Sequence, residues 1–167
     1  MATNAAPVYG KQYIRYAETF EAAVDAETGS PAATTAGTNI GVVEIGELRA
    51  VTFVTSAGAN VVAQPDALAA GTWTSLAGQI AGINQAYMPT ALAQPYTARQ
   101  LTVATSGLLL IEVDPASAAI NINTPLQVNT AGQAVAAGTA VNLDGTTPIV
   151  RENVTIGGRR LALVSFA

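Results

Sequence analysis

The sequence contains no cysteine and no histidine, and each absence excludes a class of catalytic or metal site. Without cysteine the chain has no thiol nucleophile, no thiolate ligand for zinc and no disulfide bond. Without histidine it has no imidazole general base, which rules out a Ser-His-Asp triad. A chain of 167 residues can bury roughly 70% of its unfolded surface, so it needs neither metal nor disulfide to fold. We therefore predict that the protein uses no metal and no cofactor.

Charged residues are also scarce. They make up 11% of the chain, against about 25% in a typical soluble domain, and Lys11 is the only lysine. The net charge is −4 and no basic cluster exists beyond Arg159 and Arg160, so nucleic acid is not an expected partner. A surface this poor in charge is most simply explained if much of it lies against other protein subunits.

Long hydrophobic runs are missing as well. The most apolar run, residues 108–111, is far shorter than the roughly 20 residues that a membrane-spanning helix requires. Residues 1–7 lack the basic and apolar regions of a secretory signal. We therefore expect no membrane partner and no export by the secretory route.

Aromatic side chains gather near the N-terminus, where residues 1–40 differ in composition from the rest of the chain. A polar stretch, residues 25–39, follows them and reads as a linker. One interpretation is an edge strand or short helix packed on the domain. The other, which we adopt, is an arm that anchors on a neighbouring subunit, so that deleting residues 1–24 would weaken attachment without unfolding the domain. The candidate interface residues of this arm are Tyr9, Tyr13, Arg15, Tyr16 and Phe20.

Residues 41–167 are typical of a β domain, in one piece or two small lobes. We predict strands at 101–105 and 108–113, joined by a turn at Ser106 and Gly107. The unbroken apolar start of the second strand predicts burial on both of its faces. Two sites, Asp144-Gly145 and Gly157-Gly158, are typical of tight hairpin turns. Short strands with turns this frequent predict an all-β barrel or sandwich.

One pair of carboxylates is a candidate catalytic site. Glu112 and Asp114 are two residues apart, so on a strand they would point to the same side, as acid–base chemistry requires. However, Asp114 precedes Pro115 at the expected end of a strand, where charged residues usually face water. We therefore predict that the protein is not an enzyme. A hydrolase would lose activity on the substitution Glu112→Gln, whereas a structural protein would tolerate it.

Three segments carry a resemblance to a known family. They are residues 96–114 (YTARQLTVATSGLLLIEVD), 126–134 (LQVNTAGQA) and 156–164 (IGGRRLALV). Together they resemble the cement, or decoration, proteins of tailed-bacteriophage heads. The resemblance implies a small β-barrel or β-tulip-like domain with an extended N-terminal arm. It brings no catalytic residue with it.

The resemblance also implies a function and partners. Such a protein is expected on the outer surface of the expanded head, where it clamps adjacent major capsid subunits. It is expected to be made in the host cytoplasm and to form a homotrimer. The alternative is another virion β-protein, such as a tail-tube, fibre or head-completion component, which would assemble into rings or fibres by itself.

Overall fold

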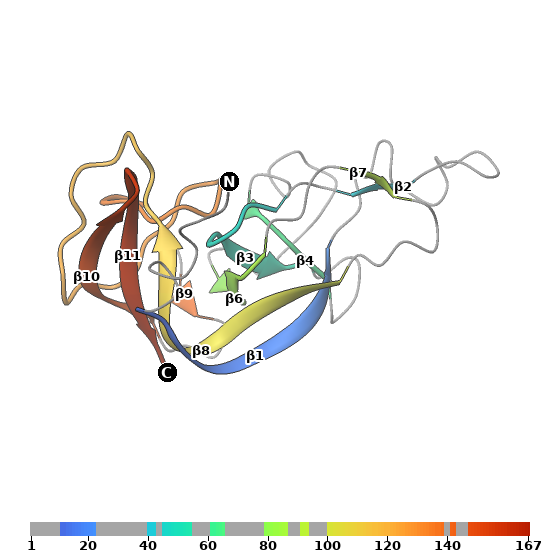
Figure 1. Cartoon of the computed structure of the whole chain (residues 1–167), viewed down its shortest axis with the longest axis horizontal. Helices are drawn as coiled ribbons and strands as arrows, with labels where there is room; N and C mark the ends of the chain where they lie inside the picture. Colours follow the sequence, from blue (N-terminus) through green and yellow to red (C-terminus); the bar gives the residue numbers. More distant parts are fainter. Residues whose placement is uncertain are drawn as a thin grey trace.

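The fold of the described part of the chain is all-β, as predicted (Figure 1). The computed structural model describes residues 11–22, 40–42, 45–54, 61–65, 79–86, 91–93, 100–138, 141–142 and 147–167. Its strands are β1 (Tyr13–Ala22), β2 (Ile40–Val42), β3 (Ala50–Phe53), β4 (Val61–Ala63), β5 (Gln79–Ile80), β6 (Gly82–Asn84), β7 (Ala91–Ala93), β8 (Gln100–Glu112), β9 (Val141–Asn142), β10 (Ile149–Ile156) and β11 (Arg159–Phe166).

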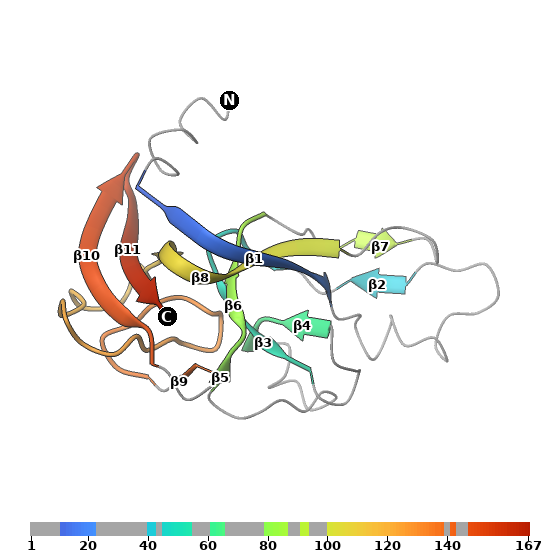
Figure 2. The same ribbon diagram turned by 90° about the horizontal axis from the view of Figure 1, so that it is seen from below.

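Seven strands form one mixed sheet in the order β1-β4-β3-β6-β8-β11-β10. A further pairing of β1 with β8 joins β1, β4, β3, β6 and β8 into a partial ring. The β1–β4 pair is parallel, and the other pairs of this sheet are antiparallel. Figure 2 shows β1 and β8 lying side by side, with the β10–β11 hairpin at one end of this ribbon. Two small sheets, β2-β7 and β5-β9, complete the described strands.

The central element is β8, and here the sequence-based prediction was wrong. Instead of two strands joined by a turn at Ser106 and Gly107, residues 100–112 form one continuous strand. Gly107 has a φ of 125°, which side-chain-bearing residues rarely adopt, and it lies between Ile14 of β1 and Phe166 of β11. The glycine therefore bends the strand where two neighbours converge, and the chain does not reverse there. Both views show this curvature of β8 (Figures 1 and 2).

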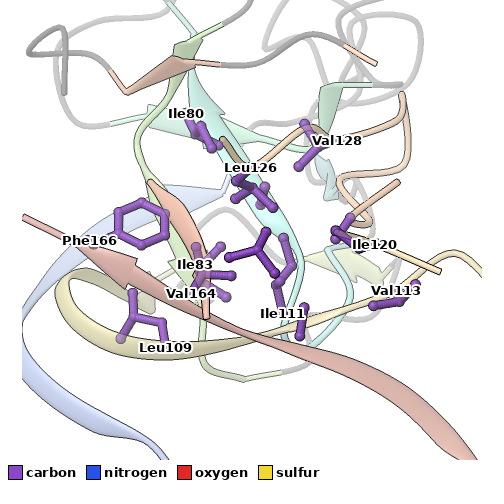
Figure 3. Packing of buried hydrophobic residues seen from close by; sticks show 14 of the residues in the cluster. Ile80, Ile83, Leu109, Ile111, Val113, Ile120, Leu126, Val128, Val164 and Phe166 are labelled. Atoms are coloured by element: carbon purple, nitrogen blue, oxygen red, sulfur yellow. The ribbon is translucent and has the colours of Figure 1, made fainter. Parts of the chain in front are cut away.

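The second half of β8 is buried on both faces, as its apolar sequence predicted. Leu109, Leu110 and Ile111 have no exposed surface. Leu109 and Ile111 belong to the largest hydrophobic cluster, shown in Figure 3, together with Ile83 of β6 and Val164 of β11. Leu110 points to the other face and packs in a separate cluster. Each face of β8 therefore stabilises a different part of the core.

The β10–β11 hairpin confirms the turn predicted at Gly157-Gly158. Both glycines have positive φ angles, 58° and 80°, and Ile156 pairs with Arg159 across the turn. Two consecutive positive φ angles are what a two-residue type I′ turn requires. The hairpin predicted at residues 144–145 lies outside the described residues.

Residues 13–22 form a strand of the sheet, so the packed-strand interpretation describes this segment and the free arm does not. β1 pairs with β8 from Tyr13 to Glu21 and with β4 at Glu21 and Ala22. Deletion of residues 1–24 would therefore remove part of the sheet, and the expectation that the domain would stay folded is corrected. Residues 1–10 and 23–39, the rest of the expected arm and linker, lie outside the described residues.

Candidate protein-interaction surface

Exposed apolar side chains gather where β1 crosses the bend of β8. Of the five large hydrophobic residues that are exposed in the described part of the chain, four lie here. We define the β1 patch as these four residues: Tyr13, Ile14, Tyr16 and Leu108. The two tyrosines are the most open, with 67% of Tyr13 and 60% of Tyr16 exposed. The fifth exposed residue, Ile122, lies in the long segment that follows β8.

The strand pairing explains how the patch is built. Tyr13 lies opposite Leu108 in the antiparallel ladder, so the two side chains share a face. Every residue from Tyr13 to Thr19 is exposed, on both faces of β1, whereas Phe20 and Ala22 are buried in the core. A strand normally covers at least one face with other parts of its own protein. The first part of β1 therefore offers both faces to a partner.

Side-chain hydrogen bonds hold the start of β1 in place. The Gln12 side-chain oxygen accepts a hydrogen bond from the Leu110 backbone N–H at 2.8 Å, and its amide nitrogen donates to the Gln85 side chain at 3.2 Å. Next to it, the Lys11 ammonium donates to the Glu152 carboxylate on β10 at 2.7 Å. These contacts fix the strand that carries the patch, so a partner would not have to order it on binding.

The predicted interface residues fall into three groups. Tyr13, Arg15 and Tyr16 are exposed on β1, whereas Tyr9 lies outside the described residues. Phe20 is corrected: it is only 5% exposed and packs edge-on against Phe53, with ring centroids 5.4 Å apart. Because its ring is part of the protein's own core, it cannot anchor on a neighbour.

Two members of the patch were missed by the sequence analysis. Leu108 begins the apolar run that predicts burial, and Ile14 stands among more conspicuous aromatic residues. Both are exposed because β1 and β8 diverge from regular pairing here, with register shifts between Ile14 and Ala17. No signal in the sequence indicates where two strands cross.

Two charged side chains, Arg15 and Glu18, lie within residues 13–19 of β1, and Lys11 precedes the strand. Lys11 is paired with Glu152. Arg15 and Glu18 are exposed, and within the described residues neither takes part in an ion pair. They are therefore available to groups on another molecule.

The carboxylates considered for catalysis are engaged in separate contacts. Glu112 accepts a hydrogen bond from Arg49 Nε at 2.7 Å, and Arg159 lies 3.8 Å from the same oxygen. Asp114 accepts from the Ala116 backbone N–H at 2.8 Å and from the Asn129 side chain at 3.0 Å. Both oxygens of Asp114 thus stabilise the turn that follows β8.

Neither a metal cluster nor a spanning helix is found in the part of the chain that the structure describes. No group of three or more acidic side chains there could hold a metal ion. Within the same residues, no helix is long and apolar enough to cross a membrane.

Comparisons with protein-family models, with curated proteins and with solved structures each give no match. The family named by the resemblance therefore stays a prediction, which rests on residues 96–114, 126–134 and 156–164 alone.

Proposed function

We propose that this protein is a structural component of a tailed-phage head, which binds the outer surface of the expanded shell and clamps adjacent major capsid subunits. The resemblance described above motivates the proposal, and the all-β fold and low charge are consistent with it. The observation that carries it is the β1 patch, because exposed tyrosines on a fixed strand are typical of protein interfaces.

The energy available at one patch is modest. Burying the exposed part of Tyr13 or Tyr16 would gain on the order of 1–2 kcal/mol per side chain. A single contact of this size gives weak binding. A clamp, however, makes the same contact many times over a shell, and linked contacts reinforce one another through their high effective concentration. Low charge also keeps small the desolvation cost of burying this surface against another protein.

The test is co-sedimentation of the purified protein with expanded heads of its source phage, with unexpanded proheads as the comparison. We expect saturable binding to expanded heads and increased resistance of those heads to heat. The double substitution Tyr13→Ser, Tyr16→Ser should weaken binding by at least about tenfold, since it removes most of the patch. The control is Ile122→Ser, which removes an apolar side chain that is 55% exposed and lies outside the patch, and it should leave binding unchanged.

Two results would contradict the proposal. Absence of binding to either shell would remove the capsid as partner. Assembly of the protein alone into rings or fibres would favour the alternative, a tail-tube, fibre or head-completion component. Circular dichroism of each variant should match that of the parent protein, since the substitutions are all at exposed positions.

A further inference from the structure

A relay of three hydrogen bonds links the start of β1 to β8 and β6. The Leu110 backbone N–H donates to the Gln12 side chain at 2.8 Å, and Gln12 in turn donates to the Gln85 side chain at 3.2 Å. Gln85 then donates to the Ile83 carbonyl oxygen at 3.0 Å. A backbone N–H can only donate and a carbonyl can only accept, so the two ends of the relay set the orientation of both amides. The Gln12 side chain therefore takes the place of a strand residue beside Leu110.

The stretch that follows Gln12 has no hydrophobic anchor of its own. Residues 13–19 are all exposed, and none of them belongs to a hydrophobic cluster of the described part of the chain. Their pairing with β8 is interrupted by register shifts between Ile14 and Ala17. The first buried side chain of β1 is Phe20, which is 5% exposed. Segments with few buried apolar contacts and exposed backbone hydrogen bonds open locally at a lower free energy than the core does.

We infer that residues 11–19 form a strap that opens on β8 without unfolding the core, and that Gln12 is the positioning residue that keeps it closed. The opening ends at Phe20, whose ring stays in the core. The closed strap holds Tyr13 opposite Leu108, and opening separates them, so the β1 patch exists only while the strap is closed. In a shell, a point that rests on the proposed function, the closed fraction would set the apparent affinity for the capsid.

Amide hydrogen exchange tests this inference without any capsid. Backbone N–H groups alternate in direction along a strand, so that of Leu110 faces β1, whereas those of Leu109 and Ile111 face β11. In the parent protein, the Leu110 amide should exchange together with the amides of residues 13–19 that face β8, and with the same dependence on urea. It should exchange at least about a hundredfold faster than the amides of Leu109 and Ile111. Equal protection of Leu109, Leu110 and Ile111 would overturn the inference.

Three substitutions test the role of Gln12. Gln12→Met keeps the length of the side chain and removes its acceptor and its donor, so it should raise the exchange rates of Leu110 and of residues 13–19 together by about tenfold or more. Gln12→Glu keeps an acceptor for the Leu110 N–H and should stay within about threefold of the parent rates. The control is Lys11→Met, which removes the neighbouring exposed ion pair and should also change these rates by less than about threefold.

Two further results would overturn the inference. Faster exchange at Leu110 in Gln12→Met, with residues 13–19 unchanged, would mean that Gln12 satisfies one amide without holding the strap. An equal effect of Lys11→Met would assign the closed strap to the ion pair instead of the amide relay. Because heads are absent from these measurements, their outcome is separate from that of the co-sedimentation test.

Discussion

Gly107 of β8 lies directly against the backbone of Tyr13 on β1: a Cβ atom at residue 107 would overlap the Tyr13 carbonyl oxygen. Gly107→Ala should therefore destabilise the protein by about 2 kcal/mol or more, since it adds a steric clash to an unfavourable φ. Chemical denaturation measures the loss. The control is Gly157→Ala, where φ is also positive but no atom lies within 4 Å of the added Cβ. That substitution should cost only about 1 kcal/mol.

Leu108 and Leu110 should respond differently to the same truncation. Leu110 has no exposed surface, so Leu110→Ala should lower the free energy of unfolding by about 2–5 kcal/mol. Leu108 is 38% exposed and belongs to the β1 patch, so Leu108→Ala should cost less than about 1 kcal/mol. Urea denaturation of both variants gives the comparison. Equal losses would mean that Leu108 is buried and that the patch is smaller than described.

Glu112→Gln should destabilise the protein, in contrast to the tolerance expected from the sequence. The Glu112 carboxylate accepts a hydrogen bond from Arg49 Nε at 2.7 Å. Both side chains are about four-fifths buried, with 20–21% of each exposed. Loss of its charge should cost about 1–2 kcal/mol in thermal or chemical denaturation. Glu152→Gln, which alters an ion pair that is about half exposed, should change stability by less than about 0.5 kcal/mol. A loss of similar size for both substitutions would contradict the burial of the Arg49–Glu112 pair.

Lys11 gives a chemical test of the way β1 is fixed. As the only lysine of the chain, it lies 2.7 Å from Glu152 on β10. A water-soluble carbodiimide should therefore form an amide bond between these two side chains, which mass spectrometry of the digested monomer would detect. The product should be absent from Lys11→Arg. Coupling of Lys11 mainly to other carboxylates would show that β1 does not start beside β10.

Local patterns in the sequence predicted the parts of the fold that depend on neighbouring residues. The Gly157-Gly158 turn follows from the backbone angles that glycine permits, and the two-sided burial of Leu109 to Ile111 follows from an unbroken apolar run. The all-β class of the fold follows from the frequency of short apolar strands separated by turn residues. In each case the physical cause lies within a few residues.

Long-range pairing could not be predicted in the same way. Ser106-Gly107 is typical of a turn, and only the approach of β1 on one side and β11 on the other makes it a bend inside a strand. Phe20 resembles the other aromatics of its segment, yet it is buried because β1 reaches β4 directly after it, at Glu21 and Ala22. Arg49, which binds Glu112, is 63 residues away in sequence. These relationships depend on which strands meet, and composition does not encode that.

The pairing of β1 with β8 also bears on how the chain folds as it is synthesised. Tyr13 finds its cross-strand partner Leu108 about 95 residues later in the chain. At a synthesis rate of roughly 5–20 residues per second, β1 leaves the ribosome roughly 5–20 seconds before that partner exists. Contacts this distant in sequence also slow the search that follows. During this interval the tyrosines of β1 are exposed on an unpaired strand, so the nascent chain is most vulnerable to aggregation before the last third of the protein has been made.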